Sequence, residues 1–338
     1  MIAITGGGTG GHLSIAKAIA EEYGKIGIKP LYIGSTNGQD KSWFENSPLF
    51  YKTLFLPSYG VVNQGFFGKI KSLLNIIKLS FKVRKTLRDE GVKKLFSVGG
   101  YSSAPASFAA ILGGVPLFIH EQNARMGRLN KIISFFAKEI FSSYDKNSKV
   151  KDYPVSGEWF KLQKKRVELK TIAFLGGSQG AKFINNLAIK TAPWFNENGI
   201  KIVHQTGKNE YEKIKEFYEQ NHIQADVFAF YSPLSDKLKS VDFAVARCGA
   251  GSMWELAAAK IPAVFIPYPY AANNHQYFNA KVLADKNAAI LIKQSDISAK
   301  ILISVLYGAD IAAINSALES MIEPNGAKKI VEAIESRT

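Results

Sequence analysis

Two glycine-rich segments, each following a short apolar run, are the first places where the chain could do chemistry with its backbone. Residues 6–12 read GGGTGGH after the run 2–5, and residues 176–181 read GGSQGA after the run 172–175. Glycine tolerates positive φ and lets a ligand approach the backbone, and the N–H groups at a helix start attract anions. Each segment therefore predicts either a phosphate-binding loop or a tight turn between a strand and a helix.

Neither loop completes a common nucleotide fingerprint. Residues 6–11 fit G-x-G-x-x-G, but residues 33–36, at the end of the second expected strand, lack the acidic side chain that holds a dinucleotide ribose. The ATP-type loop requires glycine and then lysine, whereas the first loop continues with His12 and the second has Ala181 before Lys182. The usual dinucleotide and ATP sites are both incomplete.

His12 lies just past the first loop, at the expected start of a helix. An imidazole with an ordinary pKa near 6.5 can act as a general base at neutral pH, or it can only position a substrate through a hydrogen bond. His204 lies in a strand pattern and His222 in a polar loop, so we expect both to be structural. His12 is therefore the first candidate for a catalytic base.

The segment 242–280 combines a strand, a turn of small residues, a helix expected from about Ser252, another strand and a polar loop. Gly249, Ala250 and Gly251 leave backbone N–H groups exposed. Ser252 is expected to cap the helix and to offer its hydroxyl to a phosphate. This helix start predicts a diphosphate site.

Polar side chains suited to a sugar nucleotide surround that helix. Glu255, expected in the first helical turn, can accept both hydroxyls of a ribose, or it can simply be a favourable charge at a helix N-terminus. Amide and imidazole groups crowd the loop that follows, at Asn273, Asn274, His275, Gln276 and Asn279. So many amides with so few charges predict contacts to sugar hydroxyls.

Short apolar runs alternate with helix-length segments along the whole chain, which predicts α/β architecture with parallel sheets. The expected strands are 2–5, 31–33, 95–98, 117–120 and 140–142, then 172–175, 202–205, 227–230, 243–247 and 263–266. Both halves open with a strand, a glycine loop and a helix. We expect two doubly wound, Rossmann-like domains with a cleft between them, divided near Ser156 into residues 1–156 and 157–318, with a C-terminal helix in 319–338 that packs back on the first domain.

The composition is that of an ordinary globular protein, with 338 residues, of which 46% are hydrophobic and 21% charged. A single cysteine, Cys248, and the lack of a leader pattern indicate a reducing cytoplasm, and no apolar stretch reaches the roughly 20 residues of a membrane span. The net charge of +15, concentrated in residues 1–155, favours phosphate-rich partners. Nucleic acid is disfavoured because no basic-aromatic recognition motif appears.

Residues 66–88 predict a basic helix with more apolar residues than one face can hold. We expect Ile70, Leu73, Leu74, Ile77 and Phe81 to pack on the sheet. Other apolar residues include Phe66, Phe67, Ile76, Leu79 and Val83, and the basic ones include Lys69, Lys78 and Lys82. The helix is either buried with a solvated basic edge or rests on an anionic membrane surface.

An ordered set of motifs through essentially the whole chain resembles the MurG family. The matching strings are GGTGGH ending at His12, GGYSSAP at 99–105, HEQN at 120–123, GGSQGA at 176–181, CGAGSMWELAAA at 248–259 and NNHQYFNA at 273–280. Members of this family are bacterial N-acetylglucosaminyltransferases that complete the lipid-linked peptidoglycan precursor. The resemblance implies a GT-B fold, UDP-N-acetylglucosamine as donor, an undecaprenyl-diphosphate-linked muramyl-pentapeptide as acceptor, and an inverting transfer that forms a β(1→4) bond.

The resemblance also implies roles for individual positions. Donor contacts are expected from Thr9, Gly10, Gly11, Asn123, Lys161, Ser178, Tyr231, Ala250, Gly251, Ser252, Glu255, His275, Gln276 and Asn279. Acceptor or membrane contacts are expected from Gly99, Gly100, Tyr101 and the helix at 66–88. Glu121 is the second candidate for the base after His12. Lys161 stands where the family commonly has an arginine, so the charge is kept but the guanidinium fork is lost.

No cofactor and no metal are expected, since the sequence contains no D-x-D pair of the kind found in metal-dependent sugar transferases. The expected location is the cytoplasmic face of the bacterial inner membrane, as a peripheral protein. A UDP-sugar epimerase or a diacylglycerol glycosyltransferase would share the donor half of this interpretation. GGTGGH and HEQN in the first half favour the MurG family over both.

Overall fold

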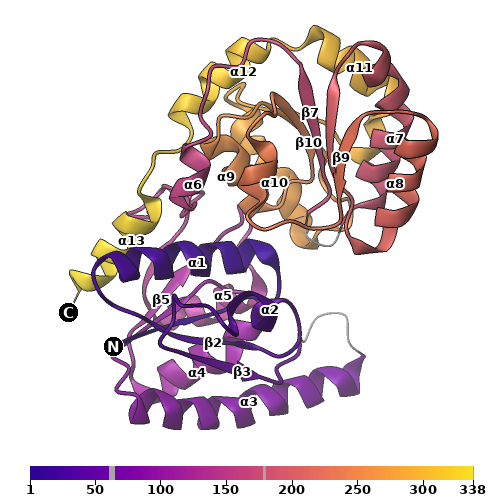
Figure 1. Ribbon diagram of the computed structural model, residues 1–338. Coiled ribbons are helices and arrows are strands. Elements are labelled where there is room, and N and C mark those ends of the chain that lie inside the picture. The colour runs from indigo at the N-terminus through magenta and orange to yellow at the C-terminus, as the bar shows by residue number, and fades with distance from the viewer. Residues whose placement is uncertain (61–64, 178–179, 338) are drawn as a thin grey trace. The chain divides into compact units, whose positions relative to one another are not determined.

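The computed structural model describes residues 1–60, 65–177 and 180–337 (Figure 1). The chain folds into two compact units. The first contains Met1–Ser156 and Asn325–Thr338, and the second contains Gly157–Pro324. Each unit holds a six-stranded parallel sheet with helices on both faces, so the expected doubly wound α/β class is confirmed.

The first unit has strand order β3-β2-β1-β4-β5-β6. The strands are β1 (Ile2–Thr5), β2 (Leu31–Ser35), β3 (Lys52–Leu56), β4 (Lys94–Ser97), β5 (Leu117–His120) and β6 (Ala137–Phe141). The helices are α1 (Gly10–Lys25), α2 (Asp40–Phe44), α3 (Phe66–Asp89), α4 (Ala104–Gly113), α5 (Arg128–Ile133) and, at the C-terminus, α13 (Gly326–Glu335). In Figure 1, α1 and α13 cover one face of the sheet, and α3 and α4 cover the other.

The second unit has strand order β12-β11-β10-β7-β8-β9. The strands are β7 (Thr171–Leu175), β8 (Lys201–Gln205), β9 (Ala225–Phe228), β10 (Phe243–Ala246), β11 (Ala263–Phe265) and β12 (Ile290–Leu291). The helices are α6 (Gly157–Phe160), α7 (Lys182–Glu197), α8 (Tyr211–Gln220), α9 (Ala250–Ala258), α10 (His275–Ala284), α11 (Ala299–Gly308) and α12 (Ile311–Ala317). The central strands, such as β1, β7 and β10, are buried at every residue because helices cover both faces, which explains their apolar runs. The edge strands β3, β6, β9 and β12 are partly exposed.

The expected packing of α3 is wrong, because the helix buries the opposite stripe. Ile76, Leu79, Val83 and Leu87 are buried. Of these, the last three belong to the core cluster on this face of the sheet. The residues expected to pack there, Ile70, Leu73, Leu74, Ile77 and Phe81, are between 43% and 61% exposed. Both stripes recur at helical spacing, so periodicity alone could not choose between them.

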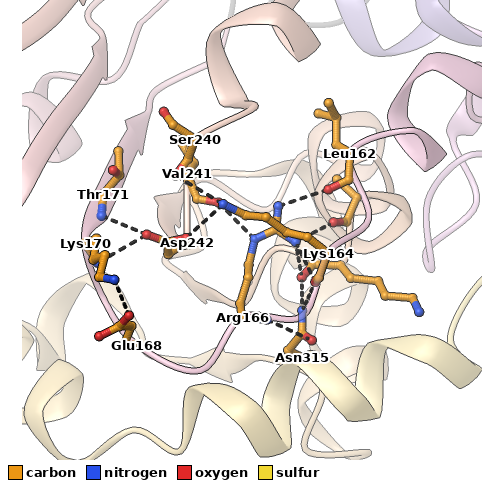
Figure 2. A network of polar contacts seen from close by, with 12 residues as sticks. Leu162, Lys164, Arg166, Glu168, Lys170, Thr171, Ser240, Val241, Asp242 and Asn315 are labelled. Atoms are coloured by element: carbon orange, nitrogen blue, oxygen red, sulfur yellow. Dashed lines mark hydrogen bonds and ion pairs between the residues drawn. The ribbon is translucent and has the colours of Figure 1, made fainter.

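Arg166 anchors the segment that follows α6 to the base of the second sheet (Figure 2). Its side chain is almost fully buried, and its guanidinium donates to the carbonyl oxygens of Val241 at 2.9 Å and Ala259 at 2.9 Å. Further donations reach the carbonyls of Leu162, Lys164 and Lys260. Burial lowers the pKa of Arg166 to about 10, so the group stays charged at neutral pH. The contacts fix how the chain enters β7.

Candidate functional site

The first glycine loop joins β1 to α1 at the carboxyl end of the first sheet. Gly6 and Gly8 have φ of +114° and +83°, which favour glycine. A Cβ on Gly6 would lie 2.4 Å from the carbonyl oxygen of Gly99, so the two glycine loops of this unit pack backbone to backbone. Thr9 is the N-cap residue of α1, and Gly10 and Gly11 open the helix. Their N–H groups belong to the helix start, where backbone donors lack intrahelical partners.

His12 lies where three segments of the first unit meet. Its Nδ1 is 3.0 Å from the Thr9 hydroxyl, and its Nε2 is 2.9 Å from the Gln122 amide nitrogen. A Cβ on Gly99 or Gly100 would come within 3.5 Å of the imidazole ring. The structure therefore brings GGTGGH, GGY and HEQN, which are far apart in the sequence, around one half-buried histidine.

Glu121 has its carboxylate committed to its own loop. Oε1 accepts from the backbone N–H of Asn123 at 2.9 Å, and Oε2 accepts from the backbone N–H of Gly127 at 3.0 Å and the amide of Asn130 at 2.8 Å. The side chain is 4% exposed. These contacts shape the loop that carries Gln122 to His12. They favour a positioning role for Glu121 over that of a base.

Tyr101 follows the second glycine pair, Gly99 and Gly100, which both have positive φ. Its ring lies over Gly8, where a Cβ would come within 2.7 Å of the ring, and its hydroxyl donates to the carbonyl of Asn37. Burial, and then the nearby charge of Asp40, raise the pKa of the Tyr101 phenol. The Tyr101 ring therefore packs on the first glycine loop at Gly8, and its hydrogen bond to Asn37 fixes the ring in place.

In the second unit, helix α9 begins earlier than expected. Gly249 is the N-cap residue, with φ −61° and ψ 134°, and the helix runs from Ala250. The expectation that Ser252 caps the helix is therefore wrong, because Gly249 already takes the extended cap conformation. Ser252 lies in the first turn, half-buried, and Glu255 falls in the second turn. A carboxylate beyond the first turn gains little from the helix dipole, which weakens the dipole interpretation of Glu255.

Three of the residues expected in a polar loop, His275, Gln276 and Asn279, lie in α10, which packs against α9. Asn279 is fully buried and donates to the carbonyl of Cys248 at 3.2 Å. Gln276 accepts from the backbone N–H of Tyr268 at 2.9 Å, and His275 Nδ1 is 2.8 Å from the carbonyl of Ala272. The segments expected to bind phosphate and sugar thus pack together in the second unit.

Arg247, which belongs to none of the motifs, connects the end of β10 to the segments that follow β11 and β12. Its guanidinium donates to the carbonyls of Ile266 and Pro267, both at 3.1 Å, and to Gln294 at 2.7 Å. Aromatic rings of Phe183 and Tyr268 lie 5.7 and 5.6 Å from it. The sequence feature that could have pointed to Arg247 is its position as a single charged residue directly after the apolar strand 243–246.

The remaining expected contacts are scattered over the two units. Tyr231 is 40% exposed, with the Lys237 ammonium 5.1 Å from its ring, and Lys161 is exposed just after α6. Asn123 is half-buried in the Glu121 loop. Ser178 lies outside the described residues. Nothing in these contacts assigns a ligand to Lys161.

Within residues 1–60, 65–177 and 180–337, no group of three or more His, Cys, Asp or Glu side chains is placed to hold a metal ion. In the same ranges no single helix has the length and apolar character of a membrane span. Helices 299–308 and 311–320 meet those criteria only as a pair bent by 78°.

Comparisons with known proteins agree across both units. The glycosyltransferase family 28 N-terminal domain matches residues 2–142, and the glycosyltransferase family 28 C-terminal domain matches residues 171–335. A protein of Campylobacter jejuni subsp. doylei is 48% identical over 98% of this chain and 96% of its own, and one of Campylobacter hominis is 49% identical with the same coverage. Both are named UDP-N-acetylglucosamine--N-acetylmuramyl-(pentapeptide) pyrophosphoryl-undecaprenol N-acetylglucosamine transferase.

Solved structures share the fold at lower identity. The crystal structure of Acinetobacter baumannii MurG superposes with a TM-score of 0.78 at 24% identity, covering 99% of both chains. The UDP-GlcNAc 2-epimerase of Neisseria meningitidis, bound to UDP-GlcNAc, gives a TM-score of 0.65 at 12% identity, again over 99% of both chains. At these identities the likeness establishes the two-domain fold.

Proposed function

Since the chain belongs to the MurG family within glycosyltransferase family 28, we propose that it transfers N-acetylglucosamine from UDP-N-acetylglucosamine to a lipid-linked muramyl acceptor. The acceptor is undecaprenyl-diphospho-muramyl-pentapeptide, its C4 hydroxyl is the nucleophile, and the products are UDP and a β(1→4)-linked disaccharide on the lipid. The near-full-length match to relatives that carry this activity in their names is the observation behind the proposal. The reaction builds the peptidoglycan precursor.

The second unit supplies the donor site in this proposal. The N-terminus of α9, at Ala250, Gly251 and Ser252, faces the diphosphate, because its backbone N–H groups and helix dipole favour negative charge. Glu255 accepts the ribose hydroxyls. The sugar hydroxyls meet His275, Gln276 and Asn279, and the uracil meets the backbone at Tyr231. The family resemblance supports these roles, and the packing of α9 against α10 supports those of the residues other than Tyr231.

Other donor contacts in the proposal come from Lys161 and Ser178 in the second unit, and from Thr9, Gly10, Gly11 and Asn123 in the first. Lys161 offers a single point charge to the diphosphate where the family has a guanidinium. Gly99, Gly100 and Tyr101 are assigned to the acceptor, because they pack directly beside His12 and the first glycine loop.

His12 is the proposed general base. An inverting transfer needs one displacement, in which the acceptor hydroxyl loses a proton as it attacks the anomeric carbon and UDP leaves. The imidazole is held by contacts to Thr9 and Gln122, and Glu121 shapes the loop behind it. The leaving diphosphate is stabilised electrostatically at the start of α9. We propose that the reaction requires no metal.

The exposed face of α3 is the proposed membrane contact. Phe66 and Phe67 are 73% and 84% exposed, and the apolar stripe that runs on from them is exposed as well. Lys69, Lys78 and Lys82 are all exposed on the same helix. Apolar side chains flanked by lysines suit an anionic lipid interface, where the acceptor resides. This supports a peripheral membrane location, which in the proposal is the cytoplasmic face of the bacterial inner membrane.

A coupled release assay tests the proposed activity. The full chain is incubated with UDP-N-acetylglucosamine, with and without the lipid-linked acceptor, in detergent and in the presence or absence of EDTA. We expect UDP release that depends on the acceptor and persists with EDTA. Release without acceptor would point to a hydrolase or an epimerase-like enzyme, and loss of activity with EDTA would refute metal independence.

His12→Ala tests the base. It should lower kcat by about 100-fold or more while leaving UDP binding unchanged, since general base catalysis contributes typically 10²–10⁴-fold. His204→Gln is the matched control, because His204 is buried between Tyr218 and Asn185 in the other unit. An unchanged kcat for His12→Ala would remove His12 as the base.

A further inference from the structure

A buried carboxylate lies directly beneath the first glycine loop. Asp40, the first residue of α2, is completely inaccessible to solvent. Its Oδ2 accepts from the backbone N–H of Gly8 at 2.6 Å, and its Oδ1 accepts from the backbone N–H of Ser35 at 3.0 Å. The Tyr32 hydroxyl lies 3.2 Å from the same Oδ1. All three of these partners are neutral.

An ionised carboxylate without a cationic partner is costly to bury, and backbone N–H donors offset that cost only in a fixed geometry. The short contact to Gly8 joins a buried charge to the loop itself. A Cβ on Gly7 would lie 2.5 Å from Asp40 Oδ1, so this part of the loop packs directly on the carboxylate. The position of the loop therefore depends on Asp40.

Tyr32 extends this support to the beginning of the loop. Its hydroxyl lies 2.8 Å from the carbonyl oxygen of Gly6. Burial, reinforced by the charge of Asp40, raises the pKa of the Tyr32 phenol, so it remains a protonated donor. Its ring packs against Phe44 and Phe50, with centroids 4.6 and 5.1 Å away. Tyr32, packed in this aromatic cluster, thus contacts the beginning of residues 6–8, and Asp40 contacts their end.

The loop leads straight into the start of α1, where Thr9 and His12 lie. The backbone N–H of Gly8 points toward the buried Asp40 carboxylate, to which it donates. This hydrogen bond fixes the orientation of the backbone just before Thr9. We propose that Asp40 is a positioning residue for sugar transfer: it holds residues 6–11 so that His12 and Thr9 are presented in their reactive arrangement, without touching either substrate. This inference rests on the proposed function of the glycine loop and of His12.

Asp40→Asn tests the proposal with the full chain. Asparagine keeps the size and one oxygen, but its NH₂ group faces a backbone N–H in place of an acceptor, so either Gly8 or Ser35 loses its partner. We expect kcat to fall by about 100-fold, the loss that a displacement of about 1 Å at a reacting group can cause. The affinity for UDP, measured by calorimetry, should stay within about 2-fold, because the proposed UDP contacts lie mainly in the second unit.

Two further variants decide between a positioning and a merely structural role. Asp145→Asn is the matched control: Asp145 also accepts a backbone N–H in the first unit, from Asn147 at 2.8 Å, but it is exposed. It should leave kcat unchanged. If Asp40→Asn does not fold, Tyr32→Phe decides: it removes only the hydroxyl, and a fall in kcat supports the proposal while an unchanged kcat overturns it.

A readout that needs no activity separates this inference from the proposed function. The imidazole NMR signals of His12 should shift in Asp40→Asn, while those of His204, in the other unit, should not. Unchanged His12 signals, or a kcat within about 3-fold of the wild type, would overturn the positioning role. Loss of UDP affinity together with kcat would also overturn it, as a sign of general disruption. Failure of the wild type to transfer sugar would refute the proposed function while leaving the NMR result to judge Asp40.

Discussion

Replacing the two phenylalanines at the start of α3 should detach the protein from lipid without unfolding it. Phe66 and Phe67 contact each other, with ring centroids 5.8 Å apart, and are 73% and 84% exposed. Fully burying a phenylalanine contributes about 1.5–3 kcal/mol. Because a side chain at an interface buries only part of its surface, we take about 1–2 kcal/mol for each, or about 2–4 kcal/mol for the pair. The double substitution to serine should therefore lower lipid partitioning by roughly 30- to 1,000-fold.

The assay is co-sedimentation with vesicles of neutral or anionic phospholipid at two salt concentrations. The phenylalanine double variant should lose binding to both kinds of vesicle, since apolar burial does not depend on charge. Changing Lys69, Lys78 and Lys82 to glutamine should weaken binding only to anionic vesicles and mainly at low salt, because each basic residue near such a surface contributes about 1 kcal/mol.

Tyr307→Ser is the matched control. Tyr307 is 88% exposed, but it lies on α11 in the second unit. Its removal should leave partitioning unchanged. Equal losses for Tyr307→Ser and for the phenylalanine pair, or no loss for either, would refute the assignment of the membrane contact to α3.

Three further predictions concern the donor site and the stability of the fold. Glu255→Gln should raise the KM for UDP-N-acetylglucosamine by about 10-fold or more with little change in kcat, since a hydrogen bond to a charged group is worth about 1.5–3 kcal/mol; an unchanged KM would leave Glu255 a structural role only. Arg166→Met should lower the free energy of unfolding, measured in urea, by about 3 kcal/mol or more, because several buried carbonyl groups lose their hydrogen-bond donor. Lys165→Met, at the exposed neighbouring residue, should have little effect. Equal losses of stability in the two variants would contradict the anchoring role of Arg166. Burial lowers the pKa of His204 to about 3, so the unfolded chain binds one more proton between pH 6.5 and pH 3 and stability falls as pH drops through that window. His204→Gln should reduce the slope of unfolding free energy against pH by about 1.4 kcal/mol per unit, and an unaltered slope would show that His204 does not titrate there.

The sheets and the glycine loops could be predicted because local patterns determine them. The buried strands β1 and β7 are mostly apolar, and the two strand–glycine–helix units stand out for that reason. Strands β3 and β12 were not expected. β12 spans only Ile290–Leu291, too short to show a pattern, and β3 begins with the polar pair Lys52 and Thr53. Their places in the sheets depend on neighbours distant in the sequence.

The face of α3 and the start of α9 show where local patterns fail. Helix α3 has two apolar stripes, and only the core beneath it, which includes Leu31, Ile33 and Leu56, selects the stripe that is buried. At α9, both Gly249 and Ser252 are acceptable N-cap residues, and the turn after β10 selects the glycine. The structure also changes which apolar residues of α3 are exposed and so available for the proposed membrane contact.

Supporting residues were the hardest part of the candidate site to predict. Asp40 and Arg247 each act through partners that lie on other segments of the chain, such as Gly8 for the first and Gln294 for the second. A carboxylate or guanidinium in such a place looks like any other charged residue in the sequence. Only the fold shows that each one is hydrogen-bonded to a distant segment of the chain.

The most direct test of the proposed sugar transfer is the mass of the lipid product. The full chain should add one N-acetylhexosamine to the undecaprenyl-diphospho-muramyl-pentapeptide, and NMR of the product should show a β anomeric linkage at C4 of the muramyl sugar. A lipid that gains no mass while UDP is released, or a product with an α linkage, would contradict it.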